Sequence, residues 1–79
     1  MNGIVEKLIE ILEEIQPDAD YENCTTLIDD EILSSMDVMS IVAELEDEYD
    51  IRILPVEIVP ANFNSAEAIW KMVQRLQNA

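Results

Sequence analysis

Two adjacent serines, Ser34 and Ser35, stand immediately before an amphipathic stretch, and a helix needs only one of them as a cap. If Ser34 is the N-cap, its hydroxyl can accept a hydrogen bond from the backbone N–H of Asp37, and the Asp37 carboxylate can accept one from the N–H of Ser34. Leu33 and Val38 occupy the two positions of a hydrophobic staple around this cap. Capping therefore accounts for Ser34 and leaves the Ser35 hydroxyl without a structural role.

The Ser35 hydroxyl would project from the first turn of the predicted helix. Exposed backbone N–H groups and the helix dipole favour negative charge there, so a phosphate ester on this hydroxyl would lie in a favourable field. This holds although the chain has 18 acidic residues against four basic ones, a formal net charge of −14 at pH 7. The pattern alone also fits an unmodified serine that is simply part of the cap.

The helix that begins at Ser35 should extend to about Tyr49 and have two apolar faces. A narrow inward stripe at helical spacing comprises Val38, Ile41, Val42, Leu45 and Tyr49. A second apolar strip outside this stripe comprises Met36, Met39 and Ala43, and we call it the methionine strip. The polar residues beside it are Ser40, Glu46 and Asp47, with Asp37, Glu44 and Glu48 further round.

An exposed apolar strip with acidic surroundings is typical of a docking surface. Methionine suits a surface that accepts several partners, because its side chain repacks easily. In the alternative interpretation, Met36 and Met39 contact the long preceding connection or the short following helix, since apolar stripes at helical spacing usually face a core. The carboxylates would then form a solvated helix face and nothing more.

Three further helices are predicted around the same core. The first ends near Ile15 or Gln16, because Pro17 pushes the preceding residue away from helical geometry. The last begins at Asn64 or Ser65, with Asn64 and Glu67 as a capping box. The inner face of the first helix comprises Ile4, Val5, Leu8, Ile11, Leu12 and Ile15, and that of the last comprises Ile69, Val73 and Leu76.

The connections complete the predicted fold. Residues 17–33 form a long connection that is held to the core by Leu27, Ile28 and Leu33. Residues 51–54 have strand-like propensity but no partner strand, so they are predicted as a connection, and the four residues between Pro55 and Pro60 have room for a single helical turn. The sequence therefore predicts an all-α fold, a four-helix bundle with a short third helix, as one domain over residues 1–79.

Charge and composition exclude several classes of function. A strongly acidic surface repels phosphate backbones and anionic lipids, so the expected partners are proteins with basic patches, not nucleic acid or membrane. The chain lacks histidine and a glycine-rich loop and has one cysteine, Cys24, which argues against an enzyme. The acidic run Asp29–Glu31 lacks the ligand spacing of an EF-hand, so no metal site is predicted.

The same features predict a location and an assembly state. Glutamates interrupt the first apolar stretch, so neither a signal peptide nor a membrane span is expected. A lone cysteine cannot form an intrachain disulfide, which fits a reducing compartment, and Cys24 is expected to pack as a small apolar residue. We expect a cytoplasmic monomer.

With these features together, the sequence resembles the acyl carrier protein family, whose members are small, acidic four-helix bundles with a short third helix. The family signature at the start of the second helix is Asp-Ser-Leu or Asp-Ser-Met. Here it reads Ser34-Ser35-Met36-Asp37, and the stretch IVAELEDEYDIRI begins at Ile41 of the same helix. The stretch PANFNSAEAIWKMVQRL resembles the family's third loop and fourth helix, so the resemblance covers nearly the whole chain.

The resemblance implies a carrier function without catalysis of its own. A phosphopantetheinyl transferase would attach a 4′-phosphopantetheine arm from coenzyme A to Ser35. The arm would carry acyl groups as thioesters and present them to synthases and to acyl-loading ligases or transferases of fatty acid, lipid or polyketide biosynthesis. The implied partner contacts are Met36, Asp37, Met39, Glu44, Asp47 and Glu48.

The chain departs from the family pattern before the modified serine. Ser34 replaces the usual aspartate, which keeps a good cap but removes a charge that transferases and partners read. Ile32 replaces a usual glycine. Ser34 could itself be the attachment site, although that register would put Leu33 in the aspartate position. Two other functions stay open, namely an aminoacyl carrier of the D-alanyl type and an acidic interaction module without a prosthetic group.

Overall fold

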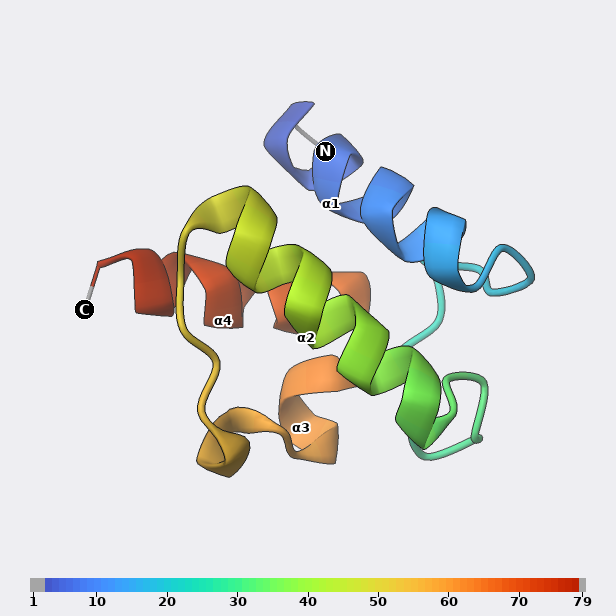
Figure 1. Cartoon of the computed structure of the whole chain (residues 1–79). Helices are drawn as coiled ribbons and strands as arrows, with labels where there is room; N and C mark the ends of the chain where they lie inside the picture. Colours follow the sequence, from blue (N-terminus) through green and yellow to red (C-terminus); the bar gives the residue numbers. More distant parts are fainter. Residues whose placement is uncertain (1–2, 79) are drawn as a thin grey trace.

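The computed structural model describes residues 3–78 and is an all-helical bundle, which confirms the predicted fold class. Figure 1 shows α2 crossing in front of α4, with α1 along the upper side and α3 below. Helix α4 contacts each of the other three, and α1 also contacts α2. The elements are α1 (Gly3–Ile15), α2 (Ser35–Tyr49), the 3₁₀ turn η1 (Pro55–Glu57), α3 (Pro60–Phe63) and α4 (Ala66–Gln77).

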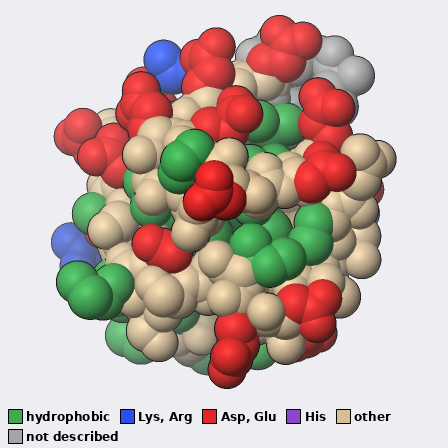
Figure 2. All heavy atoms as spheres, turned by 90° about the vertical axis from the view of Figure 1, so that its right-hand side faces the viewer, with side chains coloured by type: hydrophobic (Ala, Val, Ile, Leu, Met, Phe, Trp, Pro, Cys, Tyr) green, Lys and Arg blue, Asp and Glu red, His purple; other side chains and the backbone are tan. Residues whose placement is uncertain are grey.

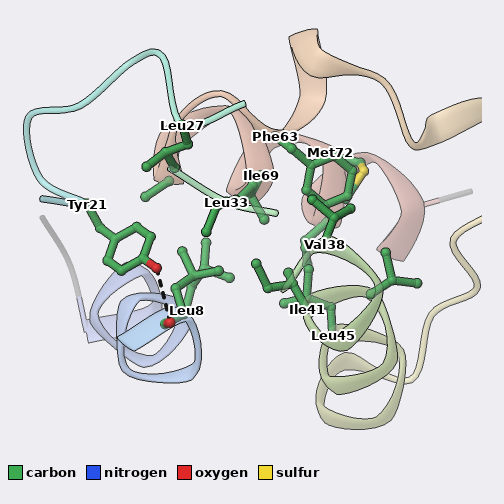
Figure 3. Close-up of a cluster of buried hydrophobic side chains, with 14 of the residues drawn as sticks. Leu8, Tyr21, Leu27, Leu33, Val38, Ile41, Leu45, Phe63, Ile69 and Met72 are labelled. Carbon is green, nitrogen blue, oxygen red and sulfur yellow. Dashed lines mark hydrogen bonds between the residues drawn. The ribbon is translucent and has the colours of Figure 1, made fainter. Parts of the chain in front are cut away.

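The predicted inward stripe of α2 is confirmed. Val38, Ile41, Val42 and Leu45 are buried, and Tyr49 packs against the same core from a partly buried position. Figure 3 shows side chains from α1, α2, α4 and the loops converging on this core. Because the stripe already supplies the side chains by which α2 packs against the core, the other apolar residues of α2 are not needed there.

Helix α1 ends at Ile15, as Pro17 predicts, and Tyr21 fastens that end. Its hydroxyl donates to the backbone carbonyl of Gln16 at 2.6 Å and to that of Leu12 at 3.2 Å, the latter drawn in Figure 3. Burial raises the pKa of Tyr21 to about 12, so the hydroxyl remains a donor at neutral pH. The predicted inner-face side chains of Ile4 and Val5 lie outside the described part of the chain.

The long connection before α2 is held by Asn64, a role that the sequence did not predict. Leu27 and Leu33 are buried as expected, and Ile28 packs against the core. The Asn64 side-chain oxygen accepts from the backbone N–H groups of Ile28 and Asp29 at 3.0 and 3.1 Å. The predicted Asn64–Glu67 capping box is therefore wrong, since the Asn64 side chain is engaged across the bundle.

Ser65 caps α4 in place of Asn64. Its hydroxyl accepts from the N–H of Ala68 at 3.0 Å, and its backbone is extended, as an N-cap requires. The sequence predicted that this helix starts at Asn64 or Ser65, and Ser65 is the N-cap. Asn64 instead follows α3 with a helical backbone.

The segment between α2 and α4 contains more helix than predicted. The expected single turn after Pro55 is the 3₁₀ turn η1, and residues 51–54 form a connection as predicted. Pro60 then starts α3, a four-residue helix in a stretch expected to be a loop. Proline is well suited to the first helical position, and Phe63, which is 1% exposed, fastens the end of α3 to the core.

Candidate functional site

The N-terminus of α2 has the predicted capping box. Ser34 has an extended backbone, and its hydroxyl oxygen accepts from the N–H of Asp37 at 3.1 Å. The Asp37 carboxylate accepts from the N–H of Ser34 at 3.0 Å. Leu33 and Val38, the two staple positions, are both buried in the core. Neither hydrogen bond of the box involves Ser35, so the cap is complete without it.

Ser35 is exposed at the first position of α2 and borders an apolar pocket. The pocket has a volume of about 220 Å³ and lies between α2, the long connection and the η1–α3 segment. Phe63 lines it from the core side. Its other lining residues are Ile28, Val38, Met39, Ile58, Val59 and Pro60. A group attached to the Ser35 hydroxyl would thus have an apolar recess beside it.

The methionine strip is exposed and begins on the other side of Ser35. Met36 is 81% exposed and Met39 is 58% exposed. With Ser35, Ser40 and Ala43 they border a shallow depression on the surface of α2. Met39 also lines the pocket together with Ile28 and Pro60, whereas Met36 borders only the shallow depression.

The surface around the site is strongly acidic. Figure 2 shows carboxylate side chains spread over one face, with apolar side chains exposed between them. After Pro60 the sequence has one acidic residue, Glu67, and two basic ones, Lys71 and Arg75. The negative charge is therefore concentrated on α1, α2 and the connections, the same part of the chain that contains Ser35.

The carboxylates predicted as partner contacts differ in burial and in the interactions they make. Glu44 and Asp47 are exposed, and the helical period places Asp47 in line with the methionine strip. Asp37 is half-buried and holds the cap, and Glu48 pairs with Lys7 of α1 at 3.2 Å. The hydrogen bond and charge of Glu48 raise the pKa of Lys7. Of these four carboxylates, those of Glu44 and Asp47 make no hydrogen bond or ion pair within the described residues.

Three further exposed apolar residues lie on the segment after α2, and sequence reasoning missed them as surface features. Leu54, Val56 and Val59 are 51%, 76% and 41% exposed. The signal was present in the sequence, because Pro55 and Pro60 confine this segment to short turns that cannot bury every side chain. Of the three, Val59 lines the pocket beside Ser35, so the exposed apolar surface near Ser35 includes more than the methionine strip.

Among residues 3–78, no three His, Cys, Asp or Glu residues form a group that could hold a metal ion, and Cys24 is partly buried. No helix in this part of the chain is long and apolar enough to span a membrane.

Comparison with protein-family models, with curated proteins and with solved structures finds no match for this chain.

Proposed function

We propose that this chain is an acyl carrier protein that is modified with 4′-phosphopantetheine on the hydroxyl of Ser35. The observation that carries this proposal is that only one of the two serines is needed to cap α2. Ser34 makes the capping hydrogen bond, whereas Ser35 is exposed at a helix N-terminus and takes no part in the capping box. An exposed hydroxyl in a field that favours phosphate is what such an attachment requires.

Attachment would break the phosphoanhydride bond of coenzyme A and form a phosphate ester on serine. The Ser35 oxygen would form a bond to the phosphorus next to pantetheine in coenzyme A, and the bond to the adenosine bisphosphate leaving group would break. The serine proton would go to a base of the transferase. Ser34 and Asp37 would contribute by fixing the first turn of α2, so that the Ser35 hydroxyl is presented on rigid backbone.

The residues around Ser35 fit a phosphopantetheine arm. When attached, the arm supplies a terminal thiol that holds an acyl group as a thioester. The phosphate would be next to the exposed N–H groups of the first turn of α2. The apolar pocket beside Ser35 offers a recess for apolar parts of the arm or its cargo.

Partner enzymes would dock on the methionine strip and its carboxylates. Met36, Met39 and Ala43 provide an exposed apolar contact, while Glu44 and Asp47 provide charge for basic side chains at the partner's entrance. We expect a phosphopantetheinyl transferase, acyl-loading enzymes and synthases of fatty acid or polyketide-type pathways to use this surface. The proposed location is the cytoplasm, where coenzyme A is available.

The test is the intact mass of the purified protein after incubation with coenzyme A and a broad-specificity phosphopantetheinyl transferase. The wild type and Ser34→Ala should gain one phosphopantetheine, and Ser35→Ala should gain none. Ser34→Asp, which restores the usual family residue, should be modified faster than the wild type.

Other results of this experiment would favour a different attachment site or a different function. Modification that persists in Ser35→Ala and disappears in Ser34→Ala would move the attachment site to Ser34. No modification by several transferases, with all variants folded, would favour an interaction module without a prosthetic group. If the arm is attached, loading with D-alanine by an adenylating ligase would distinguish an aminoacyl carrier from an acyl carrier.

A further inference from the structure

The outer wall of the pocket beside Ser35 is formed by a segment with little regular structure. Ile58, Val59 and Pro60 make this wall, between η1 and α3. The recorded backbone hydrogen bonds of Ile58 and Val59 are local, from Ile58 N–H to Pro55 and from Val59 N–H to Glu57. A three-residue turn and a four-residue helix are each too short to be stable alone. The position of this wall therefore depends on what the segment is tied to.

Glu57 ties the segment to α4 through Arg75. The two guanidinium nitrogens Nη1 and Nη2 of Arg75 donate to the two Glu57 carboxylate oxygens at 2.9 and 2.7 Å. This bidentate geometry fixes orientation as well as distance. The Glu57 side chain is only 19% exposed, whereas those of the other salt-bridged residues in the described chain are 42% exposed or more.

Asn62 of α3 completes the connection. Its side-chain N–H₂ group donates to the backbone carbonyl of Glu57 at 2.8 Å and to its carboxylate at 3.3 Å. Glu57 thus links η1, α3 and α4 at one point. The opposite wall of the pocket, at Ile28, is held by the side chain of Asn64, which follows α3. Among the described residues, the ion pairs include one from the outer segment to α4 but none to Ile28 or its neighbours in the connection.

We propose that the Glu57–Arg75 ion pair is a latch that holds the outer wall of the pocket against the bundle, and that releasing it widens the pocket. The latch belongs to the unmodified chain and does not depend on any attached group. Its consequence for cargo, namely that a released latch would shelter a larger apolar group on Ser35, rests on the proposed function.

Hydrogen exchange of unmodified protein tests the latch. In Arg75→Ala, the backbone amides of Ile58, Val59 and Asn62 should exchange about threefold faster than in the wild type, the scale expected for a well-aligned exposed ion pair. Amides of α1 and α2 should be unchanged. The matched control is Lys71→Ala, which removes the exposed ion pair to Glu67 one turn earlier on the same helix and should leave the wall unaffected.

Binding of the neutral dye N-phenyl-1-naphthylamine tests the widening of the pocket. An uncharged dye is used because the protein carries strong negative charge. Arg75→Ala and Glu57→Gln should bind it at least twofold more tightly than Lys71→Ala. Adding Met39→Glu at the pocket rim should abolish that gain.

Two results would overturn the proposal. Exchange at the wall that is equal in Arg75→Ala and Lys71→Ala would show that Glu57 and Arg75 do not hold it. Faster exchange with unchanged dye affinity would show that the wall loosens without widening the pocket. Both measurements use protein without phosphopantetheine, so their outcome is decided separately from whether Ser35 accepts the arm.

Discussion

The two ends of α2 differ in how their side chains contact the rest of the molecule. At the N-terminal end, Ser35 and Met36 are exposed beyond a complete cap. At the C-terminal end, Tyr49 packs against Trp70 with ring centroids 5.8 Å apart, and Glu48 pairs with Lys7. The N-terminal end therefore leaves Ser35 and Met36 exposed, while the C-terminal end fastens the helix to α1 and α4.

The acidic residues along α2 are in different structural environments. Glu46 is half-buried, and its carboxylate accepts from the backbone N–H of Ile53 at 2.8 Å, which fixes the connection after α2. Glu44, two residues earlier, is exposed. Docking effects should consequently be largest for Glu44 and Asp47, and stability effects largest for residues nearer the C-terminal end.

The largest expected effect is loss of the Tyr49 ring. Tyr49→Ala should lower the free energy of unfolding by about 2 kcal/mol, because it removes a partly buried aromatic side chain and its contact with Trp70. Met36→Ala at the exposed end should change it by less than about 0.5 kcal/mol. Urea unfolding followed by circular dichroism measures both.

Tyr49→Phe is the matched control for this prediction. The buried Tyr49 hydroxyl has no hydrogen-bond partner within the described residues, so its removal should be neutral or slightly stabilising. A loss in Tyr49→Phe as large as that in Tyr49→Ala would show that the hydroxyl, and not the ring, fastens this end of the helix.

The next effect separates the two serines. Ser34→Ala should cost about 1 kcal/mol of stability because it removes the N-cap, while Ser35→Ala should cost less than about 0.5 kcal/mol. Urea unfolding of the two variants and of Ser34→Asp, which keeps a capping side chain, gives the comparison. Equal losses in both alanine variants would contradict the assignment of the cap to Ser34 alone.

Local sequence patterns predicted much of the fold and of the site. The bounds of α2, its buried stripe and the capping box follow from helical spacing and from short-range side-chain chemistry, which depend on neighbouring residues. The exposure of Met36 follows from the same period, because the core stripe is complete without it. These features need no knowledge of the rest of the chain.

The unpredicted features depend on contacts between distant residues. Asn64 was assigned to a helix cap, but its side chain binds the connection 35 and 36 residues away, which no local pattern reveals. Likewise, the pocket beside Ser35 is lined by residues from Ile28 to Phe63, and the Glu57–Arg75 pair joins residues 18 apart, so neither follows from a local pattern. The short spacing between Pro55 and Pro60 predicted one turn, whereas burial of Phe63 stabilises a second one.

A smaller effect is expected at the C-cap of α2. Asp50 has φ of 51° and ψ of 50°, a left-handed conformation that suits glycine and tolerates asparagine. A carboxylate there also opposes the helix dipole. Asp50→Gly should therefore raise the free energy of unfolding by about 0.5–1 kcal/mol.

Asp50→Asn separates charge from backbone conformation at this cap. It removes the charge while keeping a side chain, so it should recover part of the gain in urea unfolding. Destabilisation by Asp50→Gly would mean that the aspartate side chain has a structural role at this end.

The smallest effect is the pH dependence of the Lys7–Glu48 pair. Glu48 raises the pKa of Lys7 above its ordinary value of 10.5, so the folded state holds this proton more tightly than the unfolded state. The stabilisation is then fully present below pH 10.5 and is lost as the pH rises through the folded pKa. The difference in unfolding midpoint between wild type and Lys7→Gln should shrink above that pH.

Deprotonation of the tyrosines at high pH does not affect the comparison of wild type with Lys7→Gln. Burial raises the pKa of Tyr21 and of Tyr49, which also weakens the fold at high pH, but both variants contain them. A difference between wild type and Lys7→Gln that stays constant across this range would show that the ion pair contributes nothing measurable.

The most direct test of the central claim is localisation of the modification by fragmentation mass spectrometry after incubation of the wild type with coenzyme A and a phosphopantetheinyl transferase. The fragments should place a single phosphopantetheine on Ser35, with Ser34 unmodified. Phosphopantetheine on Ser34, or none on either serine in correctly folded protein, would contradict the account.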